Sequence, residues 1–242
     1  MEKHLEILAD KSSLIGRALE LVTAKIQATL KVKEKCRIAL AGGNTPKPLY
    51  EAIAATSLPW DKIEVFWGDE RYVSSDDPQS NQKMAREVWL NKVNFPEANI
   101  YPMPTDSGNP SLDAQKYETA LLKAFGLARG EIPVFEIIFL GMGDDAHTAS
   151  LFPKTPALTV SDRLITVGNK DGQPRLTFTY PLINAAECII FLVTGANKQL
   201  ALSQIFAPEA DGMLYPARLI KPQGELWWLL DKEAGANLKQ EH

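Results

Sequence analysis

Two patterns of apolar and polar positions alternate along the chain and predict its helices and strands. Apolar residues at helical spacing predict helices over residues 13–30, 48–56, 81–89, 112–125 and 196–206. Short continuous apolar runs predict strands over residues 36–41, 63–67, 135–140, 163–167, 175–180, 188–194 and 225–230. We therefore expect the chain to begin with a helix that is followed by a strand.

Strands that are apolar along their whole length, with amphipathic helices between them, are typical of a sheet that is covered on both faces. The sequence thus predicts an α/β fold with a mostly parallel sheet and helices on both faces. We expect one domain over residues 1–242, with room for a small accessory lobe. Ligands of such sheets bind at the carboxyl ends of the strands. The polar residues that follow the strands are therefore the candidate functional residues.

Composition and charge narrow the class of partner. Hydrophobic residues make up 45% of the chain and charged residues 23%, which is typical of a globular protein. The 26 basic and 30 acidic residues give a formal net charge of -4, which argues against a nucleic-acid partner and leaves a small anion as a candidate ligand. The chain has no apolar run of the ~20 residues that a membrane crossing needs. Its charged start does not resemble a signal peptide. We expect a cytoplasmic protein with no membrane partner and favour a monomer.

Cysteine and histidine usage gives no sign of a metal or other cofactor. Cys36 and Cys188 each lie in an apolar run without CxxC spacing, which favours buried free thiols. The carboxylates and the one histidine in the body of the chain lack a ligand spacing such as HExxH. We expect neither a metal nor another cofactor.

A glycine-rich turn follows the first predicted strand. Gly42 and Gly43 open it, Thr45 is expected to cap the next helix, and Pro46 is expected to occupy its first position. Unsatisfied backbone N–H groups at such a helix start favour phosphate. The turn is not a P-loop, because the Gly-Lys-Ser/Thr ending is absent. For two glycines alone, a tight strand-to-helix turn that binds nothing is the favoured interpretation.

Charged residues follow the strand over residues 63–67, in the segment GDERYV. Arg71 could clamp a phosphate or a carboxylate, and Asp69 could orient a ligand or accept a proton. A solvated charge cluster is the alternative interpretation. The position at a strand end favours function.

His147 is the natural candidate for a general base. It follows the strand over residues 135–140 in the segment GMGDDAHTASLFP, close to Asp145, whereas His4 and His242 lie near the termini. Histidine is the side chain whose ordinary pKa lies nearest neutrality. A hydrogen-bonded structural histidine is the alternative, and the neighbouring carboxylates favour the catalytic interpretation.

The same segment matches a dinucleotide-binding fingerprint through Gly141, Gly143 and Ala146. That interpretation fails because the fingerprint needs a full helix behind it, and Pro153 and Pro156 interrupt any helix here.

Two further cations fall at element ends, Arg175 and Lys198. Each alone would be a solvated surface charge. Together with Arg71 and the glycine turn they supply enough positive potential for a dianionic phosphate.

Five segments occur in collinear order between Leu40 and Asp231: AGGNTP, FWGDERYV with Ser80–Asn81 after it, FLGMGDDAHTASLFP, PRLTFTYPLINAAECIIFLVTGANKQLAL and LIKPQGELWWLLD. Together they resemble the 6-phosphogluconolactonase family. The resemblance implies an α/β sandwich related to ribose-phosphate isomerases and glucosamine-6-phosphate deaminases. It also implies hydrolysis of the sugar phosphate lactone 6-phosphogluconolactone in the pentose phosphate pathway.

Two positions depart from the family pattern. Asn44 stands where the family usually has serine, and it keeps a polar side chain near the expected phosphate. Ala146 stands where glycine is usual, and alanine adopts a positive φ at a higher cost than glycine. The turn before His147 is therefore expected to differ from that of the family.

In the implied mechanism His147 draws a proton from water as it attacks the lactone carbonyl, with Asp145, Asp69 and Arg71 as further catalytic candidates. The phosphate would be held by Gly42, Gly43, Asn44, Thr45, Arg175 and Lys198. One alternative is an amino-sugar phosphate deaminase or isomerase, but that relative has a glutamate where this chain has Leu151, Phe152 and Pro153. The other alternative is a non-catalytic sugar-phosphate binding protein, which would need the cations but neither Asp145 nor His147.

Overall fold

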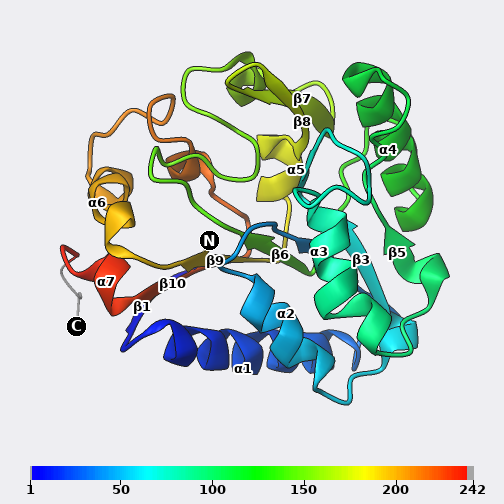
Figure 1. Cartoon of the computed structure of the whole chain (residues 1–242), viewed down its shortest axis with the longest axis horizontal. Helices are drawn as coiled ribbons and strands as arrows, with labels where there is room; N and C mark the ends of the chain where they lie inside the picture. The colour runs from blue at the N-terminus through cyan, green and yellow to red at the C-terminus, as the bar shows by residue number, and fades with distance from the viewer. Residues whose placement is uncertain (1, 239–242) are drawn as a thin grey trace.

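The computed structural model describes residues 2–238 and contains a seven-stranded sheet at its centre (Figure 1). In spatial order its strands are β1 (Glu2–Leu8), β10 (Glu225–Asp231), β9 (Cys188–Val193), β6 (Ile137–Leu140), β2 (Cys36–Leu40), β3 (Ile63–Trp67) and β5 (Ile100–Tyr101). Every neighbouring pair is parallel. The predicted fold class is confirmed.

Helices connect and cover the strands. They are α1 (Lys11–Thr29), α2 (Lys47–Ala54), α3 (Asn81–Val88), α4 (Pro110–Phe125), α5 (Tyr180–Asn184), α6 (Gln199–Phe206) and α7 (Lys232–Gly235). In Figure 1, α1 and α2 lie on one side of the sheet and α5 lies on the other. The central strands β3, β6 and β9 are buried along their whole length, as their continuous apolar runs predict.

The chain begins with β1 rather than with the expected helix, so this prediction is wrong. β1 pairs only with β10 and forms one edge of the sheet. The strand is half exposed, and an edge position tolerates the charged residues Glu2, Lys3 and Glu6, which dilute the apolar pattern. The short edge strand β5 also lacks a detectable pattern, because it has two residues.

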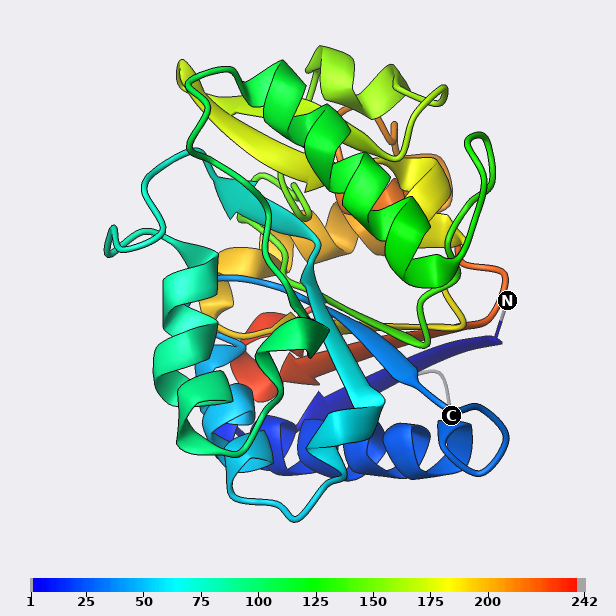
Figure 2. The same ribbon diagram turned by 90° about the vertical axis from the view of Figure 1, so that its right-hand side faces the viewer.

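A second, antiparallel sheet contains β4 (Asp69–Arg71), β8 (Gln173–Phe178) and β7 (Ile165–Lys170), with β8 in the middle. Figure 2 shows α4 running across this small sheet, on the side of the molecule away from α1. The sequence predicts no strand directly after β3, but residues Asp69–Arg71 form one. Its pairing with β8 brings Arg71 opposite Arg175.

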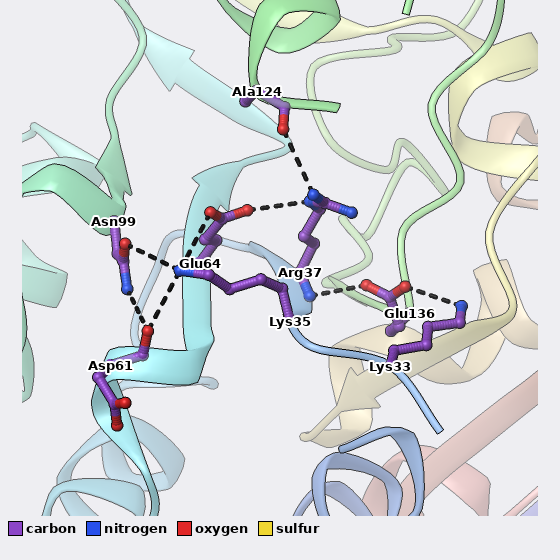
Figure 3. Close-up of polar contacts among 8 residues, drawn as sticks. All are labelled: Lys33, Lys35, Arg37, Asp61, Glu64, Asn99, Ala124 and Glu136. Atoms are coloured by element: carbon purple, nitrogen blue, oxygen red, sulfur yellow. Dashed lines mark hydrogen bonds and ion pairs between the residues drawn. The ribbon is translucent and has the colours of Figure 1, made fainter. Parts of the chain in front are cut away.

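Ion pairs close the amino ends of β2, β3 and β6 (Figure 3). The Arg37 guanidinium donates to Glu64 at 2.9 Å and to the Ala124 carbonyl at 3.3 Å. The Arg37 backbone N–H donates to Glu136 at 2.7 Å, and Lys33 donates to the same carboxylate at 2.9 Å. Both glutamates are buried, so this network satisfies charges that would otherwise be costly to desolvate.

Two further expectations concern the cysteines and membrane spans. Cys36 and Cys188 are buried and free, and burial raises the pKa of both thiols to about 12. Within the described residues, no helix combines the length and the apolar composition that a membrane crossing requires.

Candidate active site

A cavity of about 240 Å³ opens at the carboxyl ends of the central parallel strands. Its wall contains residues that follow β2, β3, β6 and β9, as the strand-end argument predicts. All of the predicted site residues except Asp145 line it: Gly42, Gly43, Asn44, Thr45, Asp69, Arg71, His147, Arg175 and Lys198. Asp145 joins them through its hydrogen bond to His147.

The glycine turn connects β2 to α2. Gly43 has a φ of 91°, a conformation that glycine adopts without strain. Gly42 has no room for a side chain, because an added Cβ would lie 1.9 Å from Oδ1 of Asn81. The expected cap at Thr45 is wrong: α2 begins at Lys47 and Pro46 precedes it without a side-chain cap. The Thr45 hydroxyl instead lies 3.4 Å from that of Thr194 on the far side of the turn.

Asp69 and Glu70 have opposite roles despite being neighbours. Asp69 faces the cavity, and its Oδ2 accepts a 2.7 Å hydrogen bond from the buried Ser150 hydroxyl. Glu70 points to the start of α3, where it accepts hydrogen bonds from the backbone N–H groups of Asn81 and Gln82. Burial raises the pKa of Glu70, and the hydrogen bonds from these N–H groups partly offset that rise. Glu70 thus anchors α3, and Asp69 is the carboxylate available to a ligand.

Arg71 and Arg175 form a pair of like charges at the cavity wall. They are cross-strand neighbours in the small sheet. Arg71 donates to the Gln79 carbonyl at 2.9 Å, but the Nε atoms of both arginines are buried without a hydrogen-bond partner among the described residues. Burial lowers the pKa of Arg175, and the neighbouring charge of Arg71 lowers it further. Two guanidinium groups with unused donors favour the binding of an anion between them.

His147 and Asp145 form a hydrogen-bonded dyad. Nδ1 of His147 lies 2.5 Å from Oδ1 of Asp145, which also accepts the His147 backbone N–H at 3.0 Å. Burial raises the pKa of Asp145, but the hydrogen bonds from His147 outweigh this effect and bring the pKa to about 2. An ionised partner at Nδ1 keeps the proton on that nitrogen and leaves Nε2 as the basic one.

The turn before His147 is formed with alanine in place of glycine. Ala146 has a φ of 65° and is fully buried. Its carbonyl accepts a 2.9 Å hydrogen bond from the Ala217 N–H, and the Gly143 N–H donates to the His147 carbonyl at 2.9 Å. The alanine therefore adopts the left-handed conformation that glycine would favour, held by contacts on both sides.

Sequence reasoning missed the residues that support the site. Asn81 donates from its side-chain amide to the Asp69 carbonyl at 3.0 Å while packing against Gly42. The buried Ser150 hydroxyl donates a hydrogen bond to Asp69. Phe152 packs against the His147 ring, with 4.5 Å between ring centroids. These contacts join segments that are distant in sequence, so no local pattern reveals them.

Other parts of the described chain give weaker candidates for a functional site. A larger cavity of about 540 Å³ lies beside α4 and β7 and contains none of the predicted site residues. Among residues 2–238, no group of three or more His, Cys, Asp and Glu side chains is placed to hold a metal ion.

A family model described as glucosamine-6-phosphate isomerases/6-phosphogluconolactonase matches residues 9–228. The chain belongs to this family. A 6-phosphogluconolactonase of Synechocystis sp. (strain ATCC 27184 / PCC 6803 / Kazusa) is 62% identical, over 99% of this chain and 100% of the relative. A 6-phosphogluconolactonase of Nostoc sp. (strain PCC 7120 / SAG 25.82 / UTEX 2576) is 60% identical, over 98% of this chain and 99% of the relative.

Solved structures of the glucosamine-6-phosphate isomerase/6-phosphogluconolactonase family show the same architecture. The 6-phosphogluconolactonase of Trypanosoma brucei matches with a TM-score of 0.86 at 31% identity, over 98% of this chain and 99% of that structure. A monomeric glucosamine-6-phosphate deaminase matches with a TM-score of 0.78 at 18% identity, over 98% of this chain and 99% of that structure. The second likeness concerns the fold alone. The family and the fold that the sequence motifs predict are thus confirmed.

Proposed function

We propose that this chain hydrolyses 6-phosphogluconolactone to 6-phosphogluconate, a step of the pentose phosphate pathway. The observation that carries the proposal is that His147, hydrogen-bonded to Asp145, lines the same cavity as Arg71 and Arg175. A phosphate site and a general base within one small cavity suit a phosphorylated ester. The two relatives at 60–62% identity, matched over nearly their whole length, carry the name of this activity.

The phosphate end of the substrate binds at the glycine turn and the cations. Gly43, Asn44 and Thr45 line the cavity in the turn that leads into α2, where backbone N–H groups are suited to bind a phosphate. Arg71 and Arg175 supply donors that the described protein leaves unused, and Lys198 adds a third positive charge at the cavity wall. This concentration of charge explains how a chain with net charge -4 binds a dianion.

The lactone is hydrolysed by water that His147 activates. Nε2 of His147 takes a proton from water as its oxygen bonds to carbon C1 of the lactone. The bond between C1 and the ring oxygen then breaks, and the imidazolium returns its proton to that oxygen. A positioned base contributes typically ~10²–10⁴-fold to the rate, and a donor to the carbonyl oxygen contributes a further ~10²–10³-fold.

Asp145 and Asp69 act as orienting groups. Asp145 fixes the tautomer of His147 and stabilises the imidazolium form. One oxygen of Asp69 is occupied by Ser150, and the other is available to accept a hydrogen bond from a sugar hydroxyl. The hydrolysis needs no covalent nucleophile.

The two alternatives receive less support. An amino-sugar phosphate deaminase or isomerase would need an acidic residue after the histidine, and this chain has Leu151, Phe152 and Pro153 there. A non-catalytic binding protein would have no use for the dyad. Ammonia release from glucosamine-6-phosphate separates the first alternative from the proposed function.

The decisive experiment follows acid release from freshly prepared 6-phosphogluconolactone, with unphosphorylated gluconolactone as the matched substrate. We expect a kcat/KM at least ~10²-fold higher for the phosphorylated lactone, because bidentate charged contacts each contribute a few kcal/mol. Activity should persist in the presence of a chelator. Equal kcat/KM values for the two lactones would contradict the phosphate site, and ammonia release that rivals lactone hydrolysis would overturn the proposed function.

A further inference from the structure

The Phe152 ring lies against the His147 ring and close to two cations, Arg175 and Lys170. The His147 ring lies against it at 4.5 Å between centroids and an interplanar angle of 41°. The Arg175 guanidinium lies 5.6 Å from the centre of the same ring, and Nζ of Lys170 lies 5.9 Å from it. Phe152 is buried, and its carbonyl accepts the Thr155 hydroxyl at 2.8 Å, so its backbone is held as well.

His147 needs a packing contact in addition to its hydrogen bond. The bond to Asp145 fixes the position of Nδ1, but rotation about that direction would still swing Nε2 away from the substrate. The Gly143 backbone lies close beside the imidazole, where a side chain at Gly143 would clash with Nδ1 at 2.1 Å, so this backbone provides one surface for the ring. The Phe152 ring provides a second surface for the imidazole. Together these two contacts define the plane of the ring.

Arg175 depends on the same phenylalanine for a different reason. Its Nε atom is buried without a hydrogen-bond partner in the described chain, and the like charge of Arg71 lies opposite in the small sheet. A contact with the face of an aromatic ring attracts a cation while leaving all its N–H donors available. The ring therefore places the guanidinium at the cavity wall without using the donors that an anion needs.

We propose that Phe152 is a positioning residue that holds the general base and the phosphate-binding arginine through one aromatic ring. The inference rests on the proposed function for its catalytic half. Its other half, the support of Arg175, concerns anion binding and needs no turnover.

The test compares Phe152→Leu, which keeps an apolar side chain but removes the ring, with Phe152→Tyr, which keeps the ring. Phe206→Leu is the matched control, because Phe206 also carries a cation over its ring, Lys3 at 4.2 Å, but its ring lies against Trp228 rather than against His147 or Arg175. Three measurements are made on each folded variant: thermal stability, the Kd for inorganic phosphate, and kcat and KM with both lactones.

For Phe152→Leu we expect phosphate binding to weaken by about 3- to 30-fold, the range that a partly buried cation–π contact supplies. We also expect kcat on unphosphorylated gluconolactone to fall by roughly 10- to 100-fold, since small displacements of a catalytic group cost this much. KM should rise for the phosphorylated lactone and change little for the other. Phe152→Tyr should keep phosphate binding and kcat near their wild-type values. Phe206→Leu should lower thermal stability and leave both of these properties unchanged.

The outcomes separate the two proposals. A wild-type protein that binds phosphate but hydrolyses neither lactone overturns the proposed function, while the phosphate titration still tests the support of Arg175. A folded Phe152→Leu variant with the kcat and phosphate Kd of the wild type overturns the inference. Loss of one property without the other overturns it too, because one ring is then not holding both groups.

Discussion

Three contacts fix the imidazole of His147: a carboxylate at Nδ1, a glycine beside it and an aromatic ring against it. In the proposed mechanism, none of these groups could replace His147 as the base. Asp145 has a pKa of about 2, so it stays ionised throughout the pH range in which an enzyme is assayed and is a poor proton acceptor there.

Replacing His147 with Gln should therefore lower kcat by ~10²–10⁴-fold while KM stays near its original value. In the proposed mechanism the neutral ring accepts the proton, so the wild-type kcat should fall on acidification. Steady-state kinetics over a pH series measure both effects, with thermal melting as a control for folding. A folded variant that keeps most of its kcat would transfer the role of base to a carboxylate.

Gly143→Ala should displace the same ring by steric contact. An added Cβ would lie 2.1 Å from Nδ1 of His147 and 2.5 Å from Oδ1 of Asp145, so the dyad has to move. We expect kcat to fall roughly 10²-fold. Gly16→Ala, in α1 with no atom within 4 Å of the added Cβ, is the matched control. It should leave kcat unchanged and stabilise the fold by about 0.5–1 kcal/mol. Equal kinetics for the two variants would show that the dyad tolerates the displacement.

At this scale the sequence predicts groups that follow strands and misses groups that support them. The sequence places Gly43, Asp69 and His147 at the cavity, because strand ends are recognisable from apolar runs and because these residue types have distinctive chemistry. Asn81 and Phe152 were not assigned roles, because their contacts with Gly42 and His147 depend on how loops fold back onto the sheet.

At the scale of elements, the loop after β4 and helix α4 are joined by one carboxylate. Asp113 in α4 is buried and accepts hydrogen bonds from the Tyr72 hydroxyl at 2.7 Å, the Ser107 N–H at 3.1 Å and Lys116 at 2.9 Å. Burial raises the pKa of Asp113, but these donors outweigh it and lower the pKa to about 2. Folding therefore favours the ionised form of the Asp113 carboxyl group.

Asp113→Asn should lower the free energy of unfolding by about 2 kcal/mol at neutral pH. The unfolded carboxyl titrates near ~3.9 and the folded one near 2, so the stabilisation is complete above pH ~4 and disappears as the pH falls toward 2. Urea unfolding of both proteins at several pH values measures the difference. A difference that stays constant down to pH ~2.5 would contradict the assignment.

The sequence predicts strands where apolar residues run without interruption and misses them where charged residues interrupt the run. The continuous apolar runs of β3, β6 and β9 are unambiguous. β1 and β4 carry charges because each has an exposed or cavity-facing side. Their strand character comes from pairing with β10 and β8, which lie far away in the sequence.

Considered as a whole, the molecule uses the two ends of its parallel strands differently. The carboxyl ends open into the cavity, while the amino ends of β2, β3 and β6 are closed by ion pairs (Figure 3). Changes at the closed end should therefore alter stability without altering chemistry.

Glu136→Gln tests this separation. Glu136 is buried and accepts from the Arg37 N–H and from Lys33, so loss of its charge should cost about 1–3 kcal/mol in the free energy of unfolding. Asp162→Asn is the control, because the Asp162–Arg163 pair is exposed, and it should change stability by less than ~0.5 kcal/mol. Denaturant unfolding and kcat per folded molecule are measured for both. A loss of kcat in Glu136→Gln would show that the two ends are coupled.

The edge strand β1 has a consequence for how the chain is made. It pairs with β10, so that Glu2 lies beside Glu225, and almost the whole described chain is synthesised between these two partners. During synthesis on the ribosome, β1 stays unpaired until β10 has been made, whereas the central strands are able to assemble earlier. Such distant pairings slow folding, because the intervening chain must be ordered before they form. The charges on β1 keep this waiting segment from adding to another chain's sheet. We therefore expect β1 to dock after the central strands have assembled.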